Sequence, residues 1–212
     1  MRFVLVALVM LSGVSFQTIR RNSQTADSTK SNPPQDQQLQ LEIPKDSWEL
    51  IFFRELDKRM KIAKLSSLRL ALPTDDLEVR FWVEDGPFGM DGIIMRRTGG
   101  AWSGTYIHGV SRKPNFKQYD TQLPPPRSGW ENAWKRLVEG GLLTLPDASQ
   151  NDCFLGGRDT TWFVFETNVN RKYRTYAYEQ PEMAKCDEAK RMVKLVGILS
   201  HEFGLHWSSP VP

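Results

Sequence analysis

The clearest alternation of apolar and polar positions lies at residues 77–84. A period of two places every second side chain on the same face of a β-strand. The apolar members of this strand are Leu77, Val79, Phe81 and Val83. Gly86 and Pro87 follow at once and are predicted to end the strand.

Two apolar stretches, residues 93–97 and 102–107, flank the pair Gly99 and Gly100. Both positions tolerate a positive φ, which is typical of a two-residue hairpin turn. We therefore expect two antiparallel strands in which Thr98 lies opposite Ala101. The same register predicts core-facing pairs at Arg97 with Trp102, Met95 with Gly104, and Ile93 with Tyr106.

A second hairpin is predicted from residues 161–167 and 173–178, which are rich in aromatic and β-branched residues. The polar residues 168–172 join them. A loop of three or five residues would place Glu166 opposite Arg174 and form an ion pair across the strands. With the first hairpin and the strand at 77–84, the sequence predicts a sheet of about five antiparallel strands.

Three stretches have the periodicity of helices. The first covers about residues 46–64, and the second begins at Ser128 or Gly129 and ends at the glycine pair 140–141. The last runs from Pro181 to Gly204, and its expected apolar stripe consists of Cys186, Ala189, Val193, Val196, Leu199 and Phe203. The element order predicts one α+β domain at residues 46–208, with the helices packed on one face of the sheet.

The N-terminus has the pattern of a secretory signal peptide. Arg2 precedes an apolar run at residues 3–11, and Gly13 and Ser15 are small residues suited to cleavage before Phe16. The alternative is a retained membrane anchor, although the run is shorter than the roughly 20 residues that cross a bilayer. We expect export of the chain to a periplasmic or extracellular location, without a stable membrane span after cleavage.

The composition changes sharply after the apolar run. Residues 16–45 are dominated by Gln, Asn, Ser, Thr, Asp and Pro, which predicts a disordered tether. The formal net charge of the whole chain is +3. This balance does not favour nucleic acid or an anionic membrane surface as a partner.

The chain contains two cysteines, Cys153 and Cys186. An even number in an exported chain predicts one structural disulfide, and the alternative is two buried free thiols. Such a bridge would stabilise the fold by about 3 to 4 kcal/mol through the entropy of the unfolded chain.

The histidines provide no recognisable catalytic motif. His201, Glu202 and His206 resemble the zinc motif H-E-x-x-H, but the two histidines are five residues apart and would not share one face of a helix. His108 has no serine elbow or third metal ligand that the sequence places beside it. We therefore expect no metal site and no cofactor.

The face of the sheet opposite the helices is the predicted binding surface. It would collect aromatic and charged side chains: Glu78, Arg80, Trp82, Glu84, Arg96, Ser103, Thr105, Trp162, Glu166, Arg174, Tyr176 and Tyr178. Tryptophan, tyrosine and arginine contribute most of the binding energy at protein interfaces. The candidate ligand-binding residues are Arg80, Trp82, Trp162, Glu166, Arg174, Tyr176 and Tyr178.

Two other interpretations of this face remain open. In the first, it is an ordinary sheet surface whose Trp82 and Trp162 are covered by an irregular loop at residues 110–129. In the second, a hydrolase uses a carboxylate-based site around Glu78, Glu84 or Glu166. The favoured hypothesis is a non-enzymatic, exported or envelope-associated domain that binds a protein, peptide or glycan.

Overall fold

The computed structural model describes one unit of the chain, which spans Pro34–Pro212. Within it, the described residues are 40–42, 65–70, 72–73, 75–85, 89–112, 115–151, 153, 160–205 and 207. The predicted signal peptide at 1–15 and the predicted helix at 46–64 lie outside them. Of the predicted tether at 16–45, the structure describes Gln40–Glu42, which form the short strand β1.

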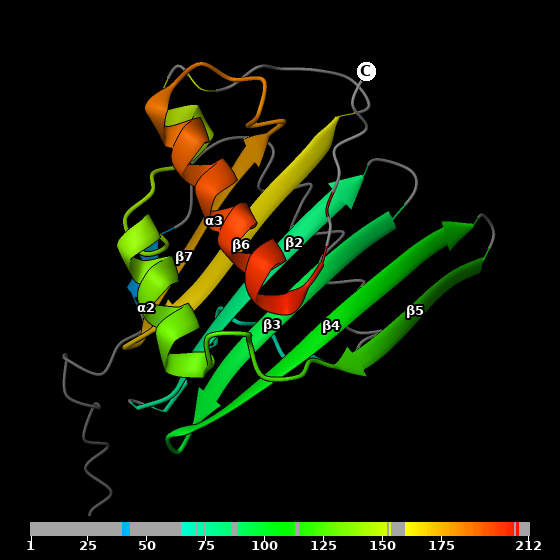
Figure 1. The fold of residues 1–212 in the computed structure, drawn as a ribbon, viewed down its shortest axis with the longest axis vertical. Coiled ribbons are helices and arrows are strands. Elements are labelled where there is room, and N and C mark those ends of the chain that lie inside the picture. Colours follow the sequence, from blue (N-terminus) through cyan, green and yellow to red (C-terminus); the bar gives the residue numbers. More distant parts are fainter. Residues whose placement is uncertain are drawn as a thin grey trace, which may run out of the picture. The chain divides into compact units, whose positions relative to one another are not determined.

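The domain has an α+β fold, as predicted, built on six antiparallel strands (Figure 1). These are β2 (Leu77–Asp85), β3 (Gly89–Thr98), β4 (Ala101–Arg112), β5 (Asn115–Gln122), β6 (Thr161–Val169) and β7 (Lys172–Glu179). The short β1 adds to β7 in the parallel direction, so the sheet order is β1-β7-β6-β2-β3-β4-β5.

The first hairpin forms in the expected register. Thr98 lies opposite Ala101, and Ile93 lies opposite Tyr106. Gly99 and Gly100 occupy the turn with φ of 55° and 84°, a backbone conformation that residues other than glycine rarely adopt. The predicted pairing of the two strands is confirmed.

The prediction of an irregular loop at residues 110–129 is wrong over most of its length. Strand β4 continues to Arg112, and β5 pairs with it along Asn115–Gln122. The stretch has no apolar alternation because a strand at the edge of a sheet need not bury one face. Periodicity therefore missed the sixth strand.

The second hairpin forms in a different register from the predicted ion-pair register. Its turn contains two residues, Asn170 and Arg171, both with positive φ. Glu166 consequently lies opposite Thr175, and Arg174 lies opposite Thr167. Because successive side chains alternate between faces, a turn of even length instead of odd length moves every β7 side chain to the other face.

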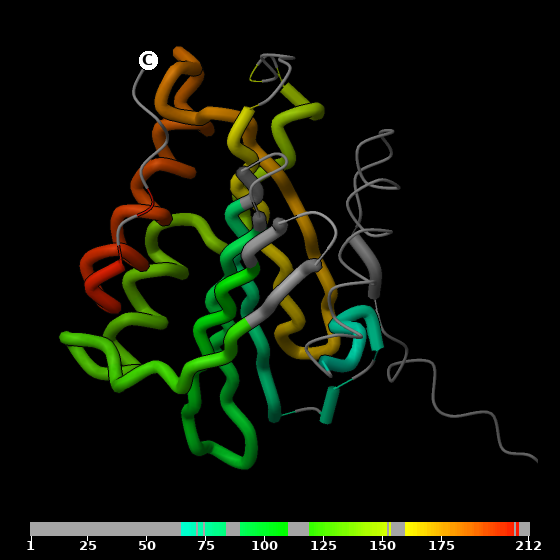
Figure 2. The backbone as a smooth tube through the Cα atoms, turned by 90° about the vertical axis from the view of Figure 1, so that its right-hand side faces the viewer, coloured from blue at the N-terminus to red at the C-terminus, as the bar shows by residue number. Residues whose placement is uncertain are grey.

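Two helices, α2 (Trp130–Gly140) and α3 (Asp187–Phe203), cover one face of the sheet (Figures 1 and 2). They end at Gly141 and Gly204, which have φ of 104° and 66°, as their glycines predict. A short 3₁₀ helix, η3, covers Ala148–Gln150. Among the described residues, no helix is long and apolar enough to cross a membrane.

The buried face of α3 differs from the predicted apolar stripe. Ala189 and Leu199 are buried as expected, whereas Val193 is 40% exposed. Met192 and Leu195 are buried in its place. The helix is thus rotated about its axis by roughly one residue, about 100°, relative to the predicted orientation.

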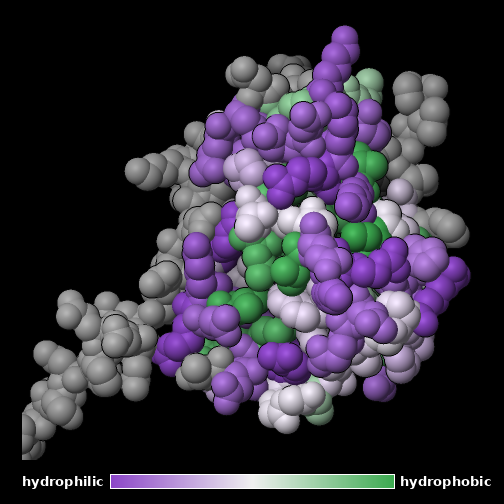
Figure 3. Space-filling view, turned by 60° about the vertical axis from the view of Figure 1, so that its left-hand side comes forward, coloured by the Kyte–Doolittle hydropathy of each residue, from purple (hydrophilic) through white to green (hydrophobic). Residues whose placement is uncertain are grey.

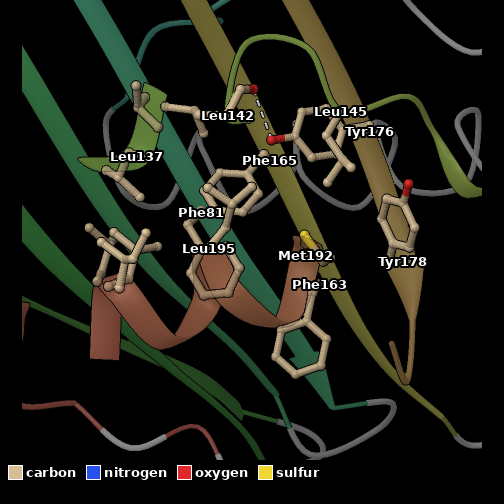
Figure 4. Packing of buried hydrophobic residues seen from close by; sticks show 14 of the residues in the cluster. Phe81, Leu137, Leu142, Leu145, Phe163, Phe165, Tyr176, Tyr178, Met192 and Leu195 are labelled. Atoms are coloured by element: carbon tan, nitrogen blue, oxygen red, sulfur yellow. Dashed lines mark hydrogen bonds between the residues drawn. The ribbon is translucent and has the colours of Figure 1, made fainter. Parts of the chain in front are cut away.

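The main core lies between the sheet and the helices. The strands contribute Phe81, Phe163 and Phe165, and the helices contribute Leu137 and Leu195, each no more than 3% exposed (Figure 4). The rings of Phe81 and Phe165 are in contact, with centroids 4.8 Å apart. This close packing of large side chains holds the helices to the sheet.

A second, smaller cluster lies on the opposite face of the sheet. It contains Leu68, Trp82, Met90, Ile94, Ile107, Val164, Tyr173 and Ala177. The described residues 65–70 and 72–73, here named the cover segment, contribute Leu65, Leu68 and Leu72 to it. Figure 2 shows the cover segment, in cyan, on the side of the sheet away from α2 and α3.

Candidate functional site

The structure divides the predicted binding residues between the two faces of the sheet. Trp82 and Trp162 belong to the cluster beneath the cover segment. Tyr176 and Tyr178 belong instead to the main core on the helix side. Their predicted placement opposite the helices is wrong, because the two-residue turn shifts β7 by one position.

Three β7 side chains hold the chain that follows α2 against the sheet. Tyr176 Oη donates to Leu142 O over 2.9 Å (Figure 4), Tyr178 Oη to Pro146 O over 2.7 Å, and Arg174 Nη2 to Leu145 O over 3.0 Å. Burial is the main reason that the pKa of Tyr176 is raised and that of Tyr178 is raised to about 12. These three residues are part of the scaffold.

On the opposite face, Arg80 and Glu78 form a buried ion pair. Arg80 Nε donates to Glu78 Oε1 over 2.6 Å, and the side chains are 0% and 1% exposed. The second Glu78 oxygen, Oε2, accepts from Arg96 over 2.6 Å. Both oxygens of Glu78 are therefore bound to arginine side chains.

Glu166 lies in the same buried region, opposite Arg80 on the neighbouring strand. Its carboxylate accepts from Trp82 Nε1 over 2.8 Å and from Tyr173 Oη over 2.9 Å. Burial raises the pKa of Glu166, while Arg80 and the two hydrogen bonds act in the opposite direction. The pKa of Tyr173 is raised by burial and by the adjacent Glu166 carboxylate.

The cover segment is fastened to the sheet through polar side chains. Asn168 Nδ2 donates to Leu68 O over 2.9 Å and to Leu70 O over 3.1 Å. Arg80 Nη2 donates to Ser66 O over 2.9 Å. Under this cover Trp82 is 3% exposed, so the predicted open surface around Trp82 is wrong, as is its predicted cover by residues 110–129.

A different group of ionisable and aromatic side chains reaches the surface on the helix side of the sheet. We name it the β3–β5 site, and its residues are Asp91, Tyr106, His108 and Tyr119. Cross-strand pairs place Asp91 beside His108 and His108 beside Tyr119. In Figure 1, α2 and α3 do not cross the upper parts of β4 and β5.

Hydrogen bonds to one carboxylate fix the β3–β5 site. Tyr106 Oη donates to Asp91 Oδ2 over 2.8 Å, and His108 Nδ1 lies 2.6 Å from Asp91 Oδ1. Burial, followed by the bond and the charge of Asp91, raises the pKa of Tyr106. His108 is 47% exposed and Tyr119 is 55% exposed, so both can contact a ligand.

Sequence reasoning missed this site although one signal for it was present. The register set by Gly99 and Gly100, continued along the hairpin, places Asp91 opposite His108. The same register also places Tyr106 two positions before His108 on the same face, but it could not locate Tyr119. Tyr119 joins them through β5, a strand that has no clear pattern.

The backbone of β5 adds a second feature to this surface, because β5 is the last strand in the sheet order. Leu123 N donates to Gly104 O over 3.0 Å, and hydrogen-bonded pairs alternate along an antiparallel ladder. Tyr119 and Thr121 are therefore bonded to β4, whereas the N–H and C=O groups of Gln118 and Gln122 point away from it.

The outer side of the helices offers a less organised surface. Figure 3 shows small hydrophobic areas there, surrounded by hydrophilic residues. Val138 of α2 and Val193 of α3 are 36% and 40% exposed. Isolated apolar residues of this kind are normal on a protein surface.

Glu202, from the rejected zinc motif, connects α3 to the start of α2. Its carboxylate accepts from Ser128 N over 2.9 Å and from Arg136 Nη1. Burial alone would raise the pKa of Glu202, but the bond from Ser128 and the charge of Arg136 lower it. His201 is 57% exposed, and His206 lies outside the described residues.

The two cysteines are paired as predicted. Cys153 and Cys186 lie at disulfide-bonding distance, with their Cα atoms 5.7 Å apart, and they are 33 positions apart in the sequence. Cys186 is also the N-cap residue of α3. The pair ties the start of this helix to the chain that follows η3.

Comparison with models of known protein families finds no match for this chain. Comparison with curated protein sequences also finds no match.

Proposed function

We propose that this chain is an exported, non-enzymatic domain that binds an extended peptide segment of a partner protein at the β3–β5 site. The observation that supports this most is the position of β5. Its outward-directed backbone groups lie beside the half-exposed His108 and Tyr119. Hydrogen bonds to a strand edge supply affinity for an extended peptide, and adjacent side chains supply specificity.

The fixed geometry of the site is a second argument for binding. Asp91 accepts a hydrogen bond from Tyr106 and lies within hydrogen-bond distance of His108, so neither ring has to be ordered when the partner arrives. Preorganised side chains reduce the entropy that is lost on association. Histidine and tyrosine also combine an apolar ring with a polar group, which suits a peptide surface.

The hydrolase alternative has less support. A catalytic carboxylate must reach its substrate. Glu78 and Glu166 are each 1% exposed, and both oxygens of each carboxylate already have partners within the chain. The side chain of Glu84 lies outside the described residues. The raised pKa of Glu166 follows from burial and needs no catalytic role.

The binding proposal can be tested with a displayed library of extended peptides, panned against the purified chain without residues 1–15. Gln118→Pro removes one outward N–H of β5, and proline is tolerated at a sheet edge. Gln118→Val is the matched control, since it keeps that N–H. His108→Ala removes the central side chain of the site, and Ser103→Ala is its control on the other face of β4.

We expect peptides that bind the wild type, Gln118→Val and Ser103→Ala, and that bind Gln118→Pro and His108→Ala at least about tenfold more weakly, a loss of about 1.4 kcal/mol. Equal binding to Gln118→Pro would overturn addition to the strand edge. Binding on a glycan array with no peptide enrichment would assign the site to a different class of partner.

Export is tested separately, because it depends on the N-terminal sequence. Mass spectrometry of the protein recovered from outside the cytoplasm should find a mature N-terminus near Phe16. Full-length chain confined to the cytosol would contradict the predicted export, whatever the peptide experiment finds.

A further inference from the structure

Three potential metal ligands meet at the start of α3. The sulfur atoms of Cys153 and Cys186 and a carboxylate oxygen of Glu188 all lie within 4.8 Å of one another. Cys153 is 1% exposed, whereas Cys186 and Glu188 are half-buried. Thiolate and carboxylate groups in such a cluster are a donor set that Zn²⁺ accepts.

Glu188 lies in the first turn of α3, where the positive end of the helix favours a carboxylate, and its side chain reaches the cysteine pair. Its Oε2 atom lies 3.8 Å from the Cys153 sulfur. A disulfide sulfur carries no hydrogen, so it cannot donate a hydrogen bond to this carboxylate. A metal ion held between the sulfur and the oxygen would make the same arrangement favourable.

The backbone of α3 favours a negatively charged sulfur at Cys186. Cys186 is the N-cap residue, and its Sγ accepts from Ala189 N over 3.3 Å. The positive end of a helix stabilises a thiolate relative to a thiol. Thiolate is the form of cysteine that binds metal.

We propose that Cys153, Cys186 and Glu188 form a redox-gated site for Zn²⁺, closed by the disulfide and opened by its reduction. A dithiol reductant supplies two electrons and two protons and becomes a disulfide itself. The Cys153–Cys186 bond breaks to two thiols, and Zn²⁺ then displaces both thiol protons. Three protein ligands leave the fourth tetrahedral position for water.

The movement that the site requires is small. Two sulfur atoms bound to a tetrahedral zinc ion at about 2.3 Å each lie about 3.8 Å apart. Side-chain rotation about Cys153 and Cys186 can supply this separation, because their Cα atoms are already 5.7 Å apart. The first turn of α3 holds the Glu188 carboxylate beside the two sulfur atoms.

The test uses the chain without residues 1–15 and without a purification tag. It is reduced with a phosphine and freed of the reductant under nitrogen. Zn²⁺ is then titrated against a chromophoric indicator, and native mass spectrometry counts the bound ions. We expect one ion per reduced chain and none at these cysteines in the oxidised chain. Zn²⁺ should also protect both cysteines from alkylation.

Glu188→Gln tests the third ligand, with Glu182→Gln as a control outside the cluster. We expect Glu188→Gln to weaken Zn²⁺ binding by at least about tenfold, since even residues that only orient a ligand cost 10- to 100-fold. If reduction unfolds the chain, Zn²⁺ should restore its circular dichroism spectrum.

Two results would overturn the site. The first is reduced wild-type chain, folded or unfolded, that neither binds nor responds to Zn²⁺. The second is equal affinity in Glu188→Gln and Glu182→Gln, which would remove Glu188 from the ligand set.

Discussion

The two faces of the sheet are both buried near its centre, but by different means. On the helix side, Phe81, Phe163 and Phe165 pack against α2 and α3, and the hydroxyls of Tyr176 and Tyr178 bond to neutral backbone carbonyls. On the opposite face, Arg80 and two glutamates lie beneath the cover segment with almost no exposure. The packing of apolar side chains mainly stabilises the helix side, whereas paired charges contribute to the stability of the opposite face.

The difference teaches that aromatic and charged residues on one strand do not by themselves mark a binding surface. Trp82 donates a hydrogen bond to Glu166, and Arg80 donates one to Ser66 O of the cover segment. These contacts within the chain make the three residues structural. The exposed candidates, His108 and Tyr119, lie on the helix side, beyond the helices. Burial therefore separates scaffold from candidate site better than residue type does.

The largest expected effect comes from breaking the buried ion pair. Arg80→Met should lower the free energy of unfolding by about 3 to 5 kcal/mol, because Glu78 and Glu166 lose a buried positive partner. Equilibrium urea unfolding measures this. Arg96→Met is the matched control, since Arg96 bonds to the same Glu78 but is 42% exposed. We expect a loss below about 1 kcal/mol there.

Equal losses in the two arginine variants would contradict the importance of burial for this ion pair. A loss below about 1 kcal/mol in Arg80→Met would have the same meaning, because the charges would then be well solvated. The slope of the urea transition should stay unchanged in both variants if the unfolded state is unaffected.

The next effect compares one hydroxyl on each face. Tyr173→Phe removes a hydrogen bond to the Glu166 carboxylate, and Tyr176→Phe removes one to the neutral Leu142 carbonyl. Bonds to charged groups contribute about 1.5 to 3 kcal/mol and neutral ones about 0.5 to 1.5. Thermal unfolding should therefore show the larger loss for Tyr173→Phe. The reverse order would place the stronger polar contact on the helix side.

The pH dependence of stability should have opposite signs for two buried glutamates. The raised pKa of Glu166 means that, above the ordinary value near 4.3, the unfolded chain ionises first. The stability of wild type relative to Glu166→Gln should therefore fall as pH rises through this range. The lowered pKa of Glu202 means that stability relative to Glu202→Gln is present above pH 4.3 and is lost as pH falls.

Urea unfolding of the wild type and both variants at closely spaced pH values from 3 to 8 measures these differences. If the free energy of unfolding depends on pH in the same way in the wild type and in Glu166→Gln, burial does not disfavour the charge of Glu166. Tyr173 does not confuse the result, because its raised pKa keeps it protonated throughout this range.

The parts of the fold that the sequence predicted are those with strong local signals. The alternation at β2, the glycine pair before β4 and the glycines that end α2 and α3 each act over a few residues. The register of the second hairpin could not be predicted, because its turn places Asn170 and Arg171, rather than glycine, at positive φ. The resulting shift of one residue in the pairing of β6 and β7 places Tyr176 and Tyr178 on the helix side of the sheet.

The candidate site was harder to predict for a different reason. Asp91 and His108 meet through a register that the sequence contains, but only the structure reveals that the helices leave them exposed. The cover segment could not be predicted either, since its carbonyls bond to Asn168, 98 and 100 positions away, and to Arg80, 14 positions away. Contacts between distant segments leave no periodic pattern.

The smallest expected effect on stability is at the β3–β5 site, and it best separates this exposed surface from the buried residues of the opposite face. His108→Ala and Tyr119→Ala should each change the free energy of unfolding by no more than about 0.5 kcal/mol, because both side chains are about half exposed and neither fills the core. Urea unfolding checks this beside the peptide-binding measurement. Loss of binding with unchanged stability would identify a functional surface. A loss of several kcal/mol would instead make these residues scaffold, like Arg80 and Trp82 on the other face.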